Sequence, residues 1–310
     1  MEARTEQVIR EHWGADEKPL VSVVCLTFNQ AAFIRETLEG FLIQETRFPF
    51  EVIVHDDAST DGTQAIIQEY AARYPSIIKP IYQQQNQYSL GVPFITTIFA
   101  SLDTPYIAIC EGDDFWTDPH KLQLQVDFLE RHEDYVMAFH DAYMFNEQGI
   151  IRNVQLAGLH RRDASQQELL RARYFSTLTV CFRNVIKALP PELHGVRMED
   201  MCWWSLLGAH GKGKYMKEIR PAAYRVHKNG VLSMRPQKHR TAMSLHAYYS
   251  LARYYQRIGQ QDLYEYFMTQ VFSQSLIVMT HRNRIQAFLQ LARKVLFKPF
   301  TNIIPSVIRK

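Results

Sequence analysis

The sequence has few of the features that mark secreted or membrane-spanning proteins. Its 310 residues include four cysteines and no CxxC pair, so neither a disulfide framework nor a zinc site is expected. No apolar run approaches the roughly 18 residues that a membrane span requires, and no N-terminal stretch has the layout of a signal peptide. Internal repeats and Gly/Ser linkers are also lacking. We therefore expect a reduced, cytoplasmic globular protein, either free or attached peripherally to the inner face of the cytoplasmic membrane.

Acidic residues are lacking from one end of the chain. The last 30 residues hold seven Lys or Arg and no Asp or Glu, although the whole chain has a net charge of only +3. Without those seven, 28 basic residues face 32 acidic ones, which is a net charge of −4. The body of the protein is therefore not basic, and its charge predicts no nucleic-acid partner.

The first half of the chain alternates between strand and helix patterns. Apolar runs rich in β-branched residues predict buried strands at 20–27, 50–56, 77–82 and 106–110. Helical spacing of apolar residues predicts helices at 31–45, 59–74, 92–102 and 118–132. Thr60 or Asp61 is placed to cap the second helix, and Pro119 lies just inside the start of the fourth. The alternation predicts an α/β fold with a mixed, mostly parallel sheet flanked by helices.

The second half is less regular. Residues 135–156 predict a hairpin that adds antiparallel strands to the sheet, and 177–182 predict another strand. A helix is expected from two acids at 199–200 to Gly211, and helices alone follow at 240–259, 263–279 and 284–297. We therefore divide the chain into an N-terminal tail (1–18), an α/β domain (19–236) and a C-terminal helical region (237–310).

Polar side chains gather where the predicted strands end. The first strand is followed by Thr27 and Asn29, the second by Asp56 and Asp57, and the fourth by the run Glu111-Gly112-Asp113-Asp114. Ligands of open α/β sheets bind at the carboxyl ends of the strands, so these groups are expected in one crevice. Clustered carboxylates suit Mg²⁺ or Mn²⁺, which often share a substrate diphosphate. The plainer alternatives are a turn with a helix cap at 56–63 and a solvated turn at 111–114.

Two later stretches add titratable groups. Glu199 and Asp200 open a predicted helix, where one of them acts as a general base or both merely offset the helix dipole. Arg225 and His227 lie two residues apart, and thus on one face of an extended segment. His227 is a candidate metal ligand and Arg225 or Lys228 a candidate phosphate partner, although a lone histidine is more often structural.

Taken together, these segments resemble the family 2 glycosyltransferases of the GT-A fold, especially the bacterial enzymes that build surface polysaccharides. The matching segments lie in order within residues 20–235: VSVVCLTFNQAAFIRETLEGFLIQE, FEVIVHDDASTDGT, YIAICEGDDFWTDPHKLQLQ, MED and YRVH. The resemblance implies that 19–116 bind a nucleotide sugar, with UDP-sugars favoured, and that 117–236 bind the acceptor. It also implies an inverting transfer of a hexosyl or N-acetylhexosaminyl group to a hydroxyl of a saccharide or lipid-linked saccharide.

The resemblance also implies roles for the polar residues. The nucleoside would be held by Thr27, Asn29, Asp56 and Asp57. Asp57 is favoured over Asp56 for the edge of the base. The DxD element would be Glu111-Gly112-Asp113, with Glu in place of the commoner first Asp, and Arg225 would reach the donor phosphates. The cation, Mn²⁺ or Mg²⁺, would be held by Asp113, His227 and Asp114. The catalytic base would be Asp200 or, as the second choice, Glu199.

The implied mechanism is a displacement at the anomeric carbon. The metal offsets the charge that grows on the diphosphate, and Asp200 takes the proton of the attacking hydroxyl. The transition state resembles an oxocarbenium ion. Four aromatic residues near the motifs either face sugar rings or, more commonly for such residues, pack in the core: Phe115, Trp116, Trp203 and Trp204.

Two rival functions use similar groups. A metal-dependent nucleotidyltransferase also clusters acids around a nucleotide, but it lacks a counterpart to the MED and YRVH segments. A non-catalytic sugar-binding assembly protein on the same fold would not need Asp200. Separately, the basic amphipathic pattern within 281–310 predicts a helix that either lies on an anionic membrane surface or docks on the catalytic domain.

Overall fold

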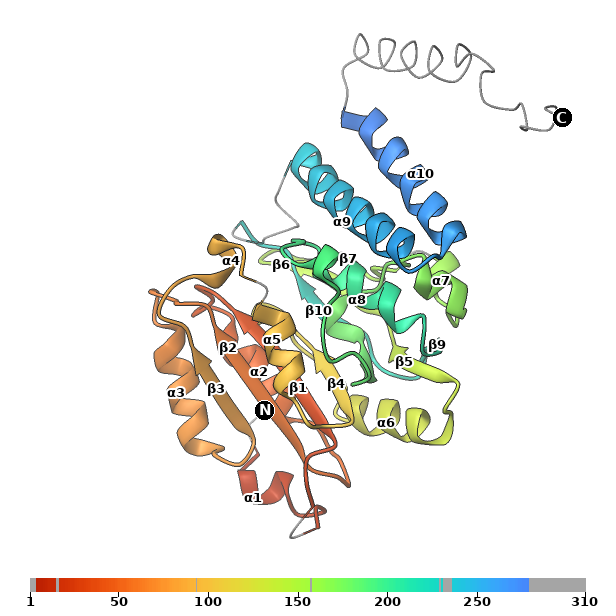
Figure 1. The fold of residues 1–310 in the computed structure, drawn as a ribbon. Coiled ribbons are helices and arrows are strands. Elements are labelled where there is room, and N and C mark those ends of the chain that lie inside the picture. The colour runs from red at the N-terminus through yellow and green to blue at the C-terminus, as the bar shows by residue number, and fades with distance from the viewer. Residues whose placement is uncertain are drawn as a thin grey trace, which may run out of the picture.

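The computed structural model describes residues 4–14, 17–92, 94–156, 158–228, 230 and 236–278. In these residues the main sheet has the strand order β3-β2-β1-β4-β8-β5-β9. The bounds of these strands are β1 Val21–Thr27, β2 Phe50–Asp56, β3 Ile78–Tyr82, β4 Tyr106–Ile109, β5 Tyr135–Phe139, β8 Cys181–Arg183 and β9 Lys212–Tyr215. β8 runs antiparallel to β4 and β5, while the other pairs are parallel. The mixed, mostly parallel sheet flanked by helices is therefore confirmed (Figure 1).

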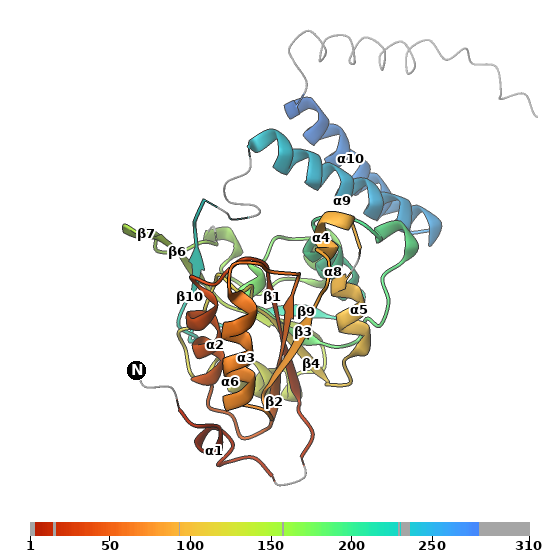
Figure 2. The ribbon, with the colours of Figure 1, turned by 90° about the vertical axis from the view of Figure 1, so that its left-hand side faces the viewer.

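Helices cover both faces of this sheet. Their bounds are α2 Ile34–Leu42, α3 Thr63–Arg73, α4 Gln87–Leu90, α5 Phe94–Ser101, α6 Lys121–Arg131, α7 Gln166–Leu170 and α8 Glu199–Leu207. Figure 2 shows α2, α3 and α6 on one side of the sheet, with α5 and α8 on the other. The alternation in β1 explains this layering: Val23 and Cys25 join one buried cluster, whereas Val24 joins the other.

The register of the central strands brings their carboxyl ends level. Thr27 at the end of β1 pairs with Asp56 at the end of β2, and Asp56 in turn pairs with Tyr82 at the end of β3. The chain after β4 continues beside the end of β1, because the Gly112 amide donates to the Leu26 carbonyl. The polar residues that follow these strands are thus neighbours in space, as predicted.

The segment predicted as a hairpin is divided between two sheets, because its first strand, β5, joins the main sheet and pairs antiparallel with β8. Strands β6 (Ala142–Asn146) and β7 (Gly149–Arg152) pair with each other antiparallel, and β10 (Ala222–Arg225) pairs with β6. These strands make a separate sheet with the order β10-β6-β7. The expectation that the main sheet gains antiparallel pairing is confirmed at β5 and β8, but it was wrong for β6 and β7, because the chain leaves that sheet between β5 and β6.

Several predicted helix ends also differ from the observed ones. Helix α6 begins at Lys121, so Pro119 precedes the helix. Helix α8 ends at Leu207 rather than near Gly211. The N-cap of α3 is Gly62, so neither Thr60 nor Asp61 occupies that position, although the Asp61 carboxylate accepts from the Thr63 amide at the first residue of the helix. The predicted polar tail includes a short helix, α1 (Glu6–Ile9), whose Ile9 is buried.

The C-terminal helices pack on the second half of the domain. Helix α9 (Gln237–Arg257) lies against α10 (Gln261–Val278), and its Leu251 and Tyr255 share a buried cluster with α8. Among the described residues, no helix combines the length and the apolar character that crossing a membrane requires. The helix predicted at 284–297 and the basic segment 281–310 lie outside the described residues.

Candidate functional site

The loop after β2 is organised by its own acidic residues. The two carboxylate oxygens of Asp57 accept from the backbone amides of Gln87 at 2.6 Å and Tyr88 at 3.0 Å. These amides open helix α4, where free N–H groups favour a negative charge. Asp57 therefore holds the chain after β3 against the end of β2, and both of its oxygens are occupied.

Asp56 differs from its neighbour. Its Oδ1 accepts from the side-chain amide of Gln64 at 2.6 Å and from the Ser59 amide at 2.9 Å. Its Oδ2 is buried and has no partner among the described residues, and the same holds for the hydroxyls of Thr27 and Tyr82 on the flanking strands. Buried polar groups are normally paired, so these three atoms mark a place where a polar ligand fits. Asp56 rather than Asp57 therefore has a carboxylate oxygen available for a ligand.

Asn29 fastens the loop after β1 to the loop after β2. Its backbone has φ of 53°, a left-handed conformation that asparagine tolerates better than most residues. The side-chain Oδ1 of Asn29 accepts from the Thr60 backbone amide at 2.8 Å. The backbone amide of Asn29 donates to the Ser59 hydroxyl, also at 2.8 Å. The Asn29 side chain thus has a structural partner in the neighbouring loop.

The acidic run after β4 lies directly against the end of β1. A Cβ added to Gly112 would come within 2.5 Å of Gln30 Oε1 and 2.9 Å of Thr27 Oγ1, so only glycine fits at this approach. Both oxygens of Glu111 lie within 2.9 Å of the Thr177 hydroxyl. Burial raises the pKa of Glu111 to about 7 despite that hydrogen bond, and the charges of Asp113 and Asp200 add to the rise.

Asp113 and His227 form the central pair of the site. Asp113 Oδ2 lies 2.8 Å from His227 Nε2, although 114 positions separate them in the sequence. Asp114 is not part of this pair, because its buried carboxylate accepts from the Arg225 amide at 2.8 Å. In the described parts of the chain, no three His, Cys, Asp or Glu side chains come together as a ready metal site. The predicted three-residue set is therefore reduced to Asp113 and His227.

Arg225 is enclosed rather than free to meet a phosphate. Its Nε donates to the Asp113 carbonyl at 2.9 Å, and its NH2 group donates to Glu36 Oε2 at 2.5 Å. Its guanidinium lies 4.7 Å from the Phe33 ring and 4.5 Å from the Phe145 ring, within cation–π range. The expectation that Arg225 contacts the donor phosphates does not fit this geometry. Arg225 instead locks together the acidic loop, helix α2 and strand β6.

A short backbone bridge adds to this connection. Phe115 and Ala223 exchange both amide-to-carbonyl hydrogen bonds, at 3.2 and 2.9 Å. Strand β10 is therefore attached to the acidic run one residue beyond Asp114. Since His227 follows β10 directly, the bridge fixes where His227 meets Asp113. The proposed alternative phosphate partner, Lys228, is exposed.

Glu199 and Asp200 occupy the first turn of α8. Burial and the neighbouring Asp200 raise the pKa of Glu199 to about 7, and Glu199 Oε2 has no partner among the described residues. Burial also raises the pKa of Asp200, despite a hydrogen bond from the Met201 amide. Because the Asp200 charge acts on Glu111, the first turn of α8 lies near the acidic run.

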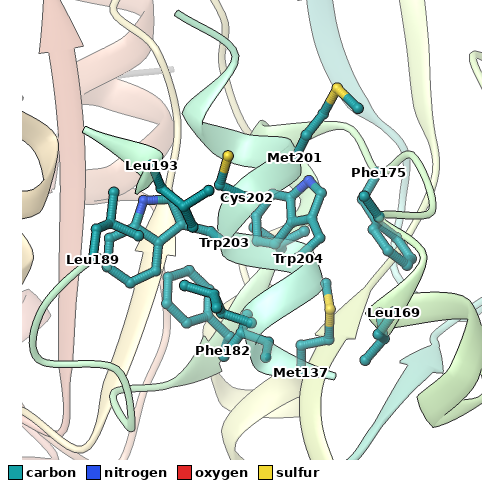
Figure 3. Close-up of a cluster of buried hydrophobic side chains, with 14 of the residues drawn as sticks. Met137, Leu169, Phe175, Phe182, Leu189, Leu193, Met201, Cys202, Trp203 and Trp204 are labelled. Carbon is teal, nitrogen blue, oxygen red and sulfur yellow. The ribbon is translucent and has the colours of Figure 1, made fainter. Parts of the chain in front are cut away.

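The tryptophans near the motifs belong to the core. Trp203 and Trp204 are buried among side chains that include Leu189, Leu193, Phe175 and Phe182 (Figure 3). Trp116 is buried as well, and its indole N–H donates to the Leu178 carbonyl at 2.7 Å. The alternative that these rings face sugars is wrong for all three. Phe115 is half-buried and packs against Phe145 at 5.6 Å.

The structure adds residues that the sequence patterns did not single out. Thr177 bonds Glu111 from 66 positions away, and Phe33 and Glu36 enclose Arg225 from helix α2 and the turn before it. Tyr174 lies near the carboxylates of Asp200 and Glu111, whose charges act on its hydroxyl. Thr177 and Tyr174 lie outside the quoted segments, and Phe33 and Glu36 lie within the first of them without a role that the spacing predicts, so only their positions in space reveal them.

Comparison with known proteins identifies the relatives of this chain. Residues 22–189 match the sequence model of the family described as Glycosyl transferase family 2. An uncharacterized protein of Mycobacterium bovis is 43% identical over 166 residues, which cover 53% of this chain and 47% of the relative. TuaG of Bacillus subtilis, named as a teichuronic acid biosynthesis glycosyltransferase, is 32% identical over 112 residues. These cover 36% of this chain and 42% of the length of TuaG. The chain thus spans about half the length of these curated relatives.

Solved structures share the fold at low sequence identity. The structure titled S. aureus TarS 1-349 in complex with UDP-GlcNAc matches 88% of this chain and 77% of its own, with TM-score 0.59 and 15% identity. The mannosyltransferase PcManGT from Pyrobaculum calidifontis, in complex with GDP-Man and Mn²⁺, matches 95% of this chain and 88% of its own, with TM-score 0.54 and 14% identity. At such identities the likeness carries the fold alone.

Proposed function

Because this chain belongs to glycosyl transferase family 2, we propose that it is an inverting, metal-dependent glycosyltransferase that moves a sugar from a nucleoside diphosphate sugar to an acceptor hydroxyl. The pairing of Asp113 with His227 beside the first turn of α8 carries this proposal. It combines two groups that suit a cation with carboxylates that suit proton transfer, all in one crevice. The donor class is supported by the solved neighbours, whose titles name UDP-GlcNAc and GDP-Man.

Asp113 and His227 fit a divalent cation as a partial set of ligands. One carboxylate oxygen and one imidazole nitrogen leave positions for diphosphate oxygens and water, which is the usual arrangement at nucleotide sites. Mn²⁺ accepts both ligand types, and PcManGT is named with this ion. When bound, the cation would offset negative charge on the leaving diphosphate.

The carboxylates at the start of α8 would accept the proton of the acceptor hydroxyl. Asp200, when ionised, accepts the proton of the acceptor hydroxyl while the hydroxyl oxygen bonds to the anomeric carbon and the bond to the diphosphate breaks. A buried carboxylate with a raised pKa is a stronger base once ionised than an exposed one. Glu199 stands beside it as the second candidate. Asp56, Thr27 and Tyr82 would pair with the nucleoside, since each has a buried polar atom to offer.

The biological role that we propose is the synthesis of a surface polysaccharide. The support is the name of TuaG, which refers to teichuronic acid, together with the sequence resemblance described above. A UDP-sugar is favoured as donor, and a saccharide or lipid-linked saccharide is expected as acceptor. The basic segment 281–310 would bring the protein to an anionic membrane that carries such an acceptor.

The test is nucleotide release from a panel of UDP-, GDP- and dTDP-sugars with Mn²⁺, Mg²⁺ or EDTA. We expect metal-dependent release from one donor, lost in EDTA and in Asp113→Ala. Asp103→Ala is the matched control, because Asp103 is exposed just before β4, at its other end. If the panel is silent and calorimetry finds no metal-linked binding of any of these nucleotide sugars, the proposal fails.

A further inference from the structure

One aromatic side chain is exposed within a segment that is otherwise buried. The segment Ala172–Ser176 connects α7 to the 3-10 turn η2 (Thr177–Thr179). Ala172, Arg173, Phe175 and Ser176 are all buried, whereas Tyr174 is 50% exposed. The half-exposed ring thus leaves apolar surface in water between buried neighbours, and a ligand with an apolar face would cover it.

This segment is held rigidly at both ends. At one end the Ser205 hydroxyl of α8 donates to the Leu170 carbonyl at 2.6 Å. At the other end the Thr177 hydroxyl lies 2.8 and 2.9 Å from the two oxygens of Glu111. Tyr174 therefore stands between the helix that carries Asp200 and the acidic run after β4.

The residue before Tyr174 fixes its backbone. The buried Arg173 guanidinium donates to the carbonyls of His160 at 2.6 Å and Arg162 at 3.1 Å. It also lies within 5.6 Å of the Phe139 and Phe175 rings. Ala172 adopts a left-handed conformation with φ of 55°, which is uncommon for alanine and is maintained here by the surrounding contacts. The ring of Tyr174 is thus presented from a pre-organised backbone.

The hydroxyl end of Tyr174 lies within the electrostatic reach of Asp200 and Glu111. The Gln155 side-chain amide donates to it at 3.3 Å. Burial of the hydroxyl, followed by the charges of Asp200 and Glu111, raises the pKa of Tyr174 to about 12. The phenol therefore stays protonated at neutral pH and can donate a hydrogen bond. Tyr174 thus combines an open ring face with a polar end beside the proposed base, which suits a sugar ring with its CH and OH groups.

We propose that Tyr174 is the platform on which the acceptor sugar lies, with the acceptor being a pyranoside whose CH face stacks on the phenol ring. This inference rests on the proposed function, since it takes Asp200 as the base. An acceptor hydroxyl must reach the base, and the segment of Tyr174 is anchored to the helix that carries Asp200. The donor is expected at the loops after β1, β2 and β4, so the two sugars would meet between Tyr174 and Asp113.

The test uses the full chain and a defined set of probes. Saturation-transfer NMR would measure the binding of four methyl pyranosides, those of glucose, galactose, mannose and N-acetylglucosamine, with UDP and Mn²⁺ present. We expect at least one of them to bind, and Tyr174→Ala to weaken that binding about tenfold, which corresponds to ~1.4 kcal/mol. Tyr174→Phe keeps the ring, so its affinity for the same pyranoside should stay within about twofold of the wild-type affinity.

Tyr249→Ala is the matched control, because Tyr249 is also 50% exposed but lies on α9. It should leave pyranoside binding unchanged, and thermal unfolding should confirm that each variant is folded. If none of the four pyranosides binds the wild type, or if Tyr174→Ala binds them equally well, the proposal is overturned. UDP binding is measured on the same samples. If the wild type does not bind UDP, the proposed function is refuted. If UDP binds and Tyr174→Ala leaves pyranoside binding unchanged, only this inference is refuted.

Discussion

The loop after β2 and the first turn of α8 both carry adjacent carboxylates, yet they use them differently. In the loop, Asp57 accepts two backbone amides of α4, and Asp61 accepts the first amide of α3. In α8, Glu199 keeps a buried oxygen that has no partner among the described residues, and its pKa rises to about 7. Carboxylates that meet amides organise the backbone, whereas carboxylates buried without such partners retain a strong affinity for a proton.

The difference separates architecture from chemistry within one crevice. A change in the loop after β2 should act first on stability and on the shape of the nucleoside site. A change in α8 should act on the rate of the reaction and leave the fold intact. The predictions below test this separation.

The largest effect is expected on the side of α8. Asp200→Asn removes the proposed base without changing its size, so kcat should fall by about 10²–10⁴-fold. Nucleotide affinity should remain as in the wild type, because Asp200 is not part of the nucleoside loops. Steady-state kinetics and calorimetry with the active donor measure the two quantities. Glu199→Gln is the companion variant, and a larger loss of kcat there would make Glu199 the base instead.

The next effect concerns the loop after β2. Asp57→Ala leaves the Gln87 and Tyr88 amides without their acceptor, so the free energy of unfolding should fall by about 2–3 kcal/mol. Urea titration followed by circular dichroism measures the change.

Asp56→Asn is the matched variant at the adjacent position. It keeps an acceptor for Ser59 and Gln64 and should lower the stability by less than about 1 kcal/mol. We expect it to weaken nucleotide binding instead, because it alters the oxygen without a partner. The reverse pattern, with Asp57 controlling affinity and Asp56 stability, would contradict our assignment of the two residues.

A smaller effect is expected at Arg225, which holds the acidic run in place beside both regions. Arg225→Gln breaks the link between the acidic run, α2 and β6, so Mn²⁺-dependent nucleotide binding should weaken by about 10–100-fold, as for other groups that orient metal ligands. Binding in EDTA should change little. Arg35→Gln is the control, since Arg35 lies on α2 and, like Arg225, pairs with a carboxylate, that of Glu69, but at the surface. If Arg225→Gln lowers the nucleotide affinity equally with Mn²⁺ and in EDTA, the positioning role of Arg225 is contradicted.

The smallest effect is a pH dependence of stability. The pKa of Glu111 is about 7 in the folded protein, above the ordinary value of about 4.3 for the unfolded chain. The folded state therefore binds the extra proton, and stability falls as the pH rises through this interval. In metal-free buffer, Glu111→Gln should remove the part of the decline between pH 5 and pH 8 that the Glu111 carboxyl contributes. An unchanged slope in urea titrations across this range would count against the burial of Glu111.

Much of the fold could be predicted because its pattern is local. The apolar runs at 20–27 and 50–56 appear as β1 and β2, and the acids that follow them lie at one edge of the sheet because parallel strands end together. The separate sheet of β6, β7 and β10 could not be predicted. Its strand β10 comes some 70 residues after β7, and no local signal says which edge it joins.

The amino-acid sequence by itself determined the alternation of strands and helices, the family, and the set of polar residues at the strand ends, since each depends on residue types at short spacing. The tertiary structure alone decided what each residue does. It assigned Asp57 to the backbone of α4, enclosed Arg225 among aromatic rings, buried Trp203 and exposed Tyr174. The physical reason is that hydrogen-bond partners and burial come from segments distant in sequence, and a carboxylate or a ring is identical in a motif whether those partners are present or not.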